Sequence, residues 1–129
     1  MILGIQTTQP KGFILYFLED QKSRQLDYPE NAGDELPSAI LNQVKPEELS
    51  GLILLAGKGS FSAVRSAAII ANTLALSRNL PAIFETPVNE SNESVLLALA
   101  RGRKRLAEGQ SDFPLAPYYD REPNITKQP

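Results

Sequence analysis

The sequence predicts an α/β domain in which one mixed five-stranded sheet carries helices on its faces. Two observations support this fold class: three short apolar segments come first, and helix-like and strand-like segments alternate after them. With 129 residues, 42% of them hydrophobic, the chain is long enough to bury one core and too short for two domains of ordinary size.

The first three segments are expected to form an antiparallel meander. They are rich in apolar or β-branched residues, and polar turn-forming residues separate each from the next. The expected strands cover residues 2–7, 12–18 and 24–28.

A helix over residues 34–44 is expected to follow the meander. Asp34 can cap its first turn, Pro37 falls within that turn, and Pro46 prevents its continuation. The apolar residues that recur at helical spacing are Leu36, Ile40, Leu41 and Val44.

The second half of the chain alternates between strand and helix patterns. It is expected to contain a strand at 52–56, a helix at 61–78, a strand at 81–86 and a helix at 92–107. Strand, helix and strand in succession imply a right-handed crossover and a parallel pair. Ser91 or Asn92 can cap the last helix, and Gly109 follows its end. We expect a domain over 1–109, of the kind found in ribonuclease-H-like and actin-like proteins, and an irregular tail over 110–129.

The composition excludes several function classes. The chain has no cysteine and no histidine, so thiol catalysis, disulfides and Ser-His-Asp triads are impossible, and neither a metal site nor a cofactor is expected. Its net charge of −2 gives no overall attraction to nucleic acid. The N-terminal segment resembles neither a signal peptide nor a membrane span, so a cytoplasmic location without membrane contact is expected.

A glycine-rich turn links the expected strand 52–56 to the helix that follows. Its residues are Gly57, Lys58, Gly59 and Ser60. Backbone N–H groups at a helix N-terminus can bind an anion, which makes a small nucleotide-binding or anion-binding protein one hypothesis. The spacing does not match a phosphate-binding loop, and a tight packing turn is the commoner interpretation.

The helix at 61–78 is apolar on more than one side. Alanines recur at four-residue intervals, at positions 63, 67, 71 and 75, and form a stripe that another backbone can approach closely. One side must face the sheet, and the other can pack on the helix 34–44 or present a subunit interface; both alternatives stay open. The candidate interface residues are Leu36, Ile40, Ala63, Ala67, Ile70, Ala71 and Leu74.

One basic cluster falls late in the last expected helix, at Arg101, Arg103, Lys104 and Arg105. Cations at a helix C-terminus are favoured by the helix dipole, so a solvated helix end is the simpler interpretation. An RNA contact is the alternative, and its affinity would fall with added salt.

The central motif resembles the signature of the TsaB family, also called YeaZ, of the bacterial machinery that makes threonylcarbamoyladenosine in tRNA. The residues that match lie at 57–67 and 71–75, with further similarity at 2–8, 80–83 and 116–123. The resemblance implies an actin-like fold and a non-catalytic subunit that binds a TsaD-like transferase through two helices. It also implies a TsaE-like ATPase as a further partner, homodimers when the chain is alone, and only indirect or weak contact with tRNA.

The sequence departs from the family pattern at three places. Only about 25 residues separate the expected strand 81–86 from the tail, so most of the family's second domain is expected to be missing. Gln6 stands where catalytic actin-like ATPases have an aspartate, and Ala63 and Ala67 replace family glycines. TsaD binds its metal partly through histidines, so this histidine-free chain cannot be that transferase.

Overall fold

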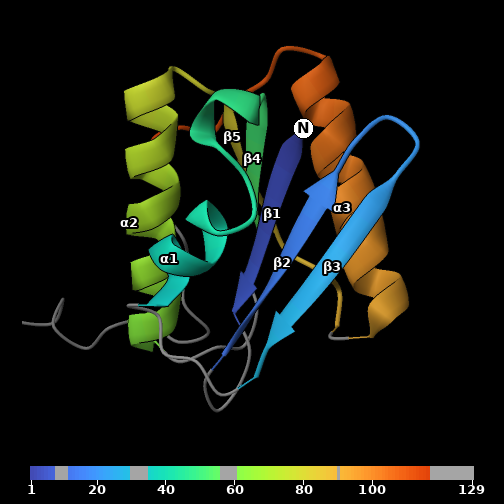
Figure 1. Ribbon diagram of the computed structural model, residues 1–129. Coiled ribbons are helices and arrows are strands. Elements are labelled where there is room, and N and C mark those ends of the chain that lie inside the picture. The colour runs from blue at the N-terminus through green and yellow to red at the C-terminus, as the bar shows by residue number, and fades with distance from the viewer. Residues whose placement is uncertain (8–11, 30–34, 56–60, 90, 117–129) are drawn as a thin grey trace, which may run out of the picture.

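The computed structural model describes residues 1–7, 12–29, 35–55, 61–89 and 91–116, and the side chains of 61–63 are not described. The described chain forms one five-stranded mixed sheet in the order β3-β2-β1-β4-β5. Helices α1 and α2 cover one face of this sheet and α3 covers the other (Figure 1). The elements are β1 (Ile2–Thr7), β2 (Phe13–Leu18), β3 (Ser23–Tyr28), α1 (Leu36–Leu41), η2 (Pro46–Glu48), β4 (Gly51–Leu55), α2 (Phe61–Arg78), β5 (Ala82–Glu85) and α3 (Asn92–Ala107).

The sheet has the mixed topology that the segment order predicts. Strand β1 pairs antiparallel with β2, which pairs antiparallel with β3, so the first half is a meander. On its other side β1 pairs parallel with β4, and β4 pairs parallel with β5. The mixed α/β fold expected from the sequence is therefore confirmed.

Strand β1 separates two hydrophobic layers. Leu3 and Ile5 pack with α1 and α2, whereas a Cβ added at Gly4 would lie 3.0 Å from Leu99 of α3. Alternate residues of a strand point to opposite faces, so the apolar residues of β1 and β4 supply both layers. In β4, Leu52 and Leu54 belong to the α1–α2 layer, and the three remaining residues of the strand face α3.

Helix α1 is shorter than expected. It spans Leu36–Leu41 instead of 34–44, and its N-cap is Glu35, which makes no capping side-chain hydrogen bond; Asp34 lies outside the described residues. The chain continues in turns, because the N–H of Val44 still donates to the carbonyl oxygen of Ile40 at 3.1 Å. Lys45 is extended, as a residue before proline tends to be.

Helix α3 begins and ends where its capping residues predict. Ser91 is the N-cap, and its hydroxyl accepts a hydrogen bond from the N–H of Ser94 at 3.1 Å. Gly109, just beyond the helix, has φ of 81°, the left-handed conformation that glycine adopts without strain.

The segment after α3 has no regular secondary structure up to residue 116, and it lies against the edge of the sheet. The N–H of Asp112 donates to the carbonyl oxygen of Ala82 at 2.7 Å, and the N–H of Phe84 donates to the Asp112 carboxylate at 2.9 Å. Further on, Leu115 and Asn72 of α2 exchange two hydrogen bonds of 2.7 and 3.1 Å. The segment therefore ties β5 to α2. Residues 117–129 of the expected tail lie outside the described part, and the proposed division at residue 109 stays a prediction.

Candidate protein interface on helices α1 and α2

The alanine stripe of α2 faces the sheet of its own chain. Ala67 and Ala71 are fully buried and Ala75 is 2% exposed, all within the layer that contains β1 and β4. Small side chains here let the helix approach the sheet closely. The side chain of Ala63 lies outside the described set.

Four of the seven predicted interface residues have no surface to offer a partner. Besides Ala67 and Ala71, the α1 residues Leu36 and Ile40 are each 1% exposed and belong to the core. Their assignment as direct contacts is corrected by this burial: they hold α1 and α2 against the sheet. Ile70 and Leu74 are half-buried against the same core, so part of each side chain remains accessible.

The opposite side of α2 carries exposed apolar side chains. Ile69 is 57% exposed and Leu76 is 73% exposed, and Thr73 lies between them at helical spacing, with its hydroxyl bonded to the Ile69 carbonyl oxygen. On α1, Leu41 is 57% exposed. We name as the α1–α2 surface the residues Leu41, Ile69, Ile70, Thr73, Leu74 and Leu76.

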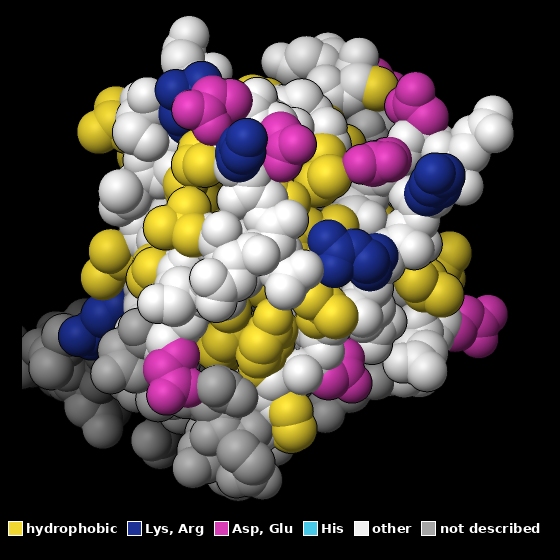
Figure 2. Space-filling model, viewed as in Figure 1, with side chains coloured by type: hydrophobic (Ala, Val, Ile, Leu, Met, Phe, Trp, Pro, Cys, Tyr) yellow, Lys and Arg dark blue, Asp and Glu magenta, His cyan; other side chains and the backbone are white. Residues whose placement is uncertain are grey.

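The α1–α2 surface lies on one side of the molecule. Helices α1 and α2 lie together on the left of Figure 1, and Figure 2 shows hydrophobic side chains reaching the surface on that side. A pattern in the sequence could have identified its exposed members: Ile69, Thr73 and Leu76 recur at helical spacing on the side of the helix opposite the alanines.

The glycine turn Gly57, Lys58, Gly59 and Ser60 lies outside the described residues, so its use as an anion site stays a prediction.

Gln6, which stands where catalytic actin-like ATPases have an aspartate, lies within the described residues and is buried. Its side-chain oxygen accepts a hydrogen bond of 2.6 Å from the Tyr16 hydroxyl. Burial, aided by the negative charge of Asp27, raises the pKa of Tyr16 to about 12, so this hydroxyl stays a donor near neutral pH. Within the described ranges, no group of three or more acidic side chains could hold a metal ion.

The basic cluster on α3 is largely occupied by contacts within the chain. The Glu85 carboxylate of β5 forms salt bridges with Arg101 at 3.0 Å and with Arg105 at 3.2 Å, and Arg105 forms a second salt bridge with Asp112 at 2.7 Å. The sequence identifies the four basic residues but not their pairing with these acids, because only folding brings β5 and the segment after α3 close to that helix.

The remaining two basic residues differ in their contacts. Arg103 donates to the carbonyl oxygen of Glu19 in the β2–β3 turn at 3.1 Å, and Lys104 is exposed. An RNA contact by this cluster stays a prediction. It would have to rely mainly on Lys104, since the others already hold the fold together.

The Asp112–Arg105 pair changes the pKa of both groups. Burial alone would raise the pKa of the Asp112 carboxyl, but hydrogen bonds from Arg105 and from the Phe84 N–H outweigh burial and lower it. The hydrogen bond to Asp112 is the largest cause of the raised pKa of Arg105. Both groups are therefore charged over the ordinary pH range, and the pair connects α3 to the segment that follows it.

Comparison with known proteins gives a fold. No family model matches the chain, and no curated protein matches it. Solved structures do match it, among them two from Pseudomonas aeruginosa. One is an uncharacterized protein with similarity to peptidase YeaZ, 18% identical, with a TM-score of 0.54 over 67% of this chain and 43% of that one. The other is YeaZ, 18% identical, with a TM-score of 0.55 over 67% of this chain and 45% of that one.

The chain has a YeaZ-like fold. It spans less than half the length of either YeaZ-like structure. At this identity the match establishes the architecture alone, which agrees with the sheet order and with the fold expected from the signature at 57–67. Among the described helices, none combines the length and the apolar character needed to cross a membrane.

Proposed function

We propose that this chain is a non-catalytic scaffold subunit that binds a TsaD-like transferase through the α1–α2 surface and supports threonylcarbamoyladenosine synthesis in tRNA. A second copy of the chain is the occupant when the transferase is absent. The observation that carries the proposal is the set of three large apolar side chains, Leu41, Ile69 and Leu76, left exposed on adjacent helices of a YeaZ-like fold.

The exposed side chains supply a driving force for association. Complete burial of a leucine or isoleucine contributes about 1.5–3 kcal/mol, and these residues keep 57–73% of their surface exposed. Burying all three would therefore contribute about 3–5 kcal/mol before the cost of association is subtracted. Half-buried Ile70 and Leu74 would add contacts at the margin of this surface.

Three polar side chains that a catalytic site could have used are engaged within the chain, which supports a binding role over a catalytic one. Gln6 is engaged by Tyr16, and Glu85 and Asp112 are engaged by arginines, so each has a structural partner. In this proposal the transferase supplies the chemistry and most of the tRNA contact. A TsaE-like ATPase and a cytoplasmic location belong to the same hypothesis.

The test is co-expression of the chain with the TsaD-like transferase of the same organism, followed by co-purification. Leu76→Asp and Ile69→Asp should abolish the complex, because each buries a charge in the interface without entering the core. The matched control is Val88→Asp: Val88 is 86% exposed and lies between β5 and α3, outside the α1–α2 surface.

Two outcomes would overturn the proposal. One is a complex that survives both α2 substitutions, which would place the partner elsewhere on the chain. The other is no complex, together with ATP–Mg²⁺ binding in a calorimeter that Gly59→Val abolishes. That second result would favour the anion-binding alternative.

A further inference from the structure

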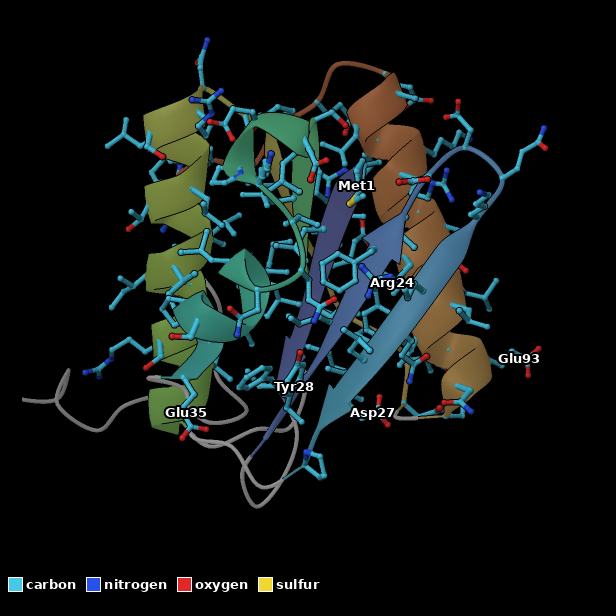
Figure 3. The ribbon with its side chains drawn as sticks, in the orientation of Figure 1. Met1, Arg24, Asp27, Tyr28, Glu35 and Glu93 are labelled. Atoms are coloured by element: carbon cyan, nitrogen blue, oxygen red, sulfur yellow. The ribbon has the colours of Figure 1, made fainter. Side chains whose placement is uncertain are left out.

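The outward face of α3 carries a four-residue stripe, on the opposite side of the sheet from the α1–α2 surface. Its members are Glu93, Leu97, Ala100 and Lys104. All four are exposed, Leu97 to 56%, and spacings of four, three and four residues keep them on one side of the helix. Figure 3 shows Glu93 projecting away from the sheet at the beginning of α3.

This α3 stripe lies opposite the part of the helix that packs on the sheet. The buried residues of α3 are Val95, Ala98, Leu99 and Gly102. Leu96, which is 59% exposed, borders the stripe on one side and enlarges its apolar centre. The stripe is therefore an unpartnered helix face with an apolar middle and one charge at each end.

The stripe is complementary to itself when it is reversed. Glu93 and Lys104 lie at equal distances along the helix from the midpoint between Leu97 and Ala100, because the stripe spacing is symmetric. In an antiparallel pair of α3 helices related by a two-fold axis, each Glu93 would lie opposite Lys104 of the second copy. Each Leu97 would then lie opposite the small Ala100 of the second copy, as large and small residues alternate in packed helices.

We propose that a second copy of this chain docks antiparallel on the α3 stripe. The charge pattern selects this occupant: a nucleic acid would be repelled by Glu93, and an apolar peptide would leave both charges unmatched. The 3–4 spacing is typical of helices that cross at a shallow angle, about 20°. A contact confined to one helix of each copy belongs to the small interfaces, below about 1,200 Å² in total, so the dimer is weak.

The two surfaces can be occupied at once, because the sheet lies between them. An α3 dimer would leave both α1–α2 surfaces free, and each could hold its own partner. The α3 dimer does not depend on the proposed function, which concerns the other face.

Charge reversal tests the α3 dimer directly. Glu93→Lys alone places two lysines opposite each other at both ends of the pair, and Lys104→Glu alone places two glutamates there. The measurement is sedimentation equilibrium over a concentration series, with Leu76→Asp in every chain to block self-association through the α1–α2 surface. In this background each single variant should dimerise about tenfold or more weakly than the Leu76→Asp chain itself. An equimolar mixture of the two variants should recover the affinity of that chain, because both contacts in the mixed dimer again join opposite charges.

The mixture also tests whether weaker dimerisation is caused by damage to the fold. Glu93→Lys loses a favourable charge in the first turn of α3, which could destabilise the helix. Mixing cannot restore a misfolded helix, so recovery on mixing shows that both variants are folded. Leu97→Asp should abolish the dimer in the same background, whereas Val88→Asp should leave it unchanged. A Leu76→Asp chain that stays monomeric up to millimolar concentration would overturn the proposal, and so would charge-reversal variants that dimerise as that chain does. Self-association that Leu76→Asp alone abolishes would place the contact entirely on the α1–α2 surface.

Discussion

Gly102→Ala in α3 should destabilise the protein, although alanine has the higher helix propensity. Glycine in a helix interior costs about 1 kcal/mol relative to alanine, so propensity alone predicts a gain of that size. The structure opposes the gain. A Cβ at position 102 would lie 2.8 Å from Cδ1 of Ile53 and 3.1 Å from its Cγ1 and Cγ2 atoms.

The contact cannot be relieved by turning one side chain. Both branches of Ile53 are close to the added carbon, and Ile53 is completely buried in β4, the strand between β1 and β5. Overpacking of a close-packed core costs about 1–3 kcal/mol, and contact with both branches places this site at the upper end. Subtracting the propensity gain leaves a net loss of about 1–2 kcal/mol in the free energy of unfolding.

Urea unfolding of Gly102→Ala, Ile53→Val and the double variant measures this effect. Ile53→Val deletes Cδ1, the atom at 2.8 Å, and should itself cost about 0.5–1.5 kcal/mol. In that background Gly102→Ala should cost less, with a coupling of about 1 kcal/mol between the two sites. A higher free energy of unfolding for Gly102→Ala, equal in both backgrounds, would refute the steric argument.

Three further substitutions test buried and paired groups. Burial raises the pKa of Tyr16 to about 12, whereas the unfolded chain has the ordinary value of 10. The free energy of unfolding should therefore be constant below pH 10 and fall by about 2–3 kcal/mol between pH 10 and pH 12. Urea titrations should show a smaller fall for Tyr16→Phe. The pKa of Asp112 is lowered, because hydrogen bonds from Arg105 and Phe84 outweigh burial, so its stabilisation is present above about pH 4 and lost in stronger acid. Asp112→Asn should therefore make acid unfolding less steep, and an unchanged acid profile would contradict this. Glu85→Gln should lower the free energy of unfolding by about 1–3 kcal/mol at neutral pH, and a neutral effect would show that the ion pairs add nothing net.

The element order could be predicted from the sequence because local chemistry determines it. Both long helices span the expected ranges, since Ser91 caps α3 and Pro81 follows the Arg78 end of α2, just before β5. The expected length of helix α1 was too great, because the apolar spacing continues to Val44, which lies in a turn and is nevertheless buried. The spacing of apolar residues indicates which residues are buried, and a residue in a turn can be buried as well as one in a helix.

The orientation of α2 could not be predicted, because this helix is apolar nearly all round. Periodicity alone cannot show which apolar side of α2 packs on the sheet. The size of the side chains determines this orientation: Ala67 and Ala71 permit close approach to the sheet, and the larger Ile69 and Leu76 remain exposed to solvent. Ala67→Arg would therefore damage the core before it tested any interface. The substitutions that test an interface are those at exposed positions.

The basic cluster shows how folding changes the meaning of a charge pattern. In the sequence four cations stand together and suggest an anionic partner. In the structure Arg101 and Arg105 are both paired with Glu85, which lies 16 and 20 residues before them, and Arg103 donates to a backbone carbonyl oxygen. Recognition depends on the charge that remains after such internal pairing. On the outward stripe of α3 that charge is the exposed Lys104, with Glu93 eleven residues before it on the same side of the helix. Arg103 keeps its charge too, but it lies off this stripe, beside the β2–β3 turn. What looked like a basic surface is a face with one charge of each sign, and that pattern fits its own reversed copy better than it fits RNA.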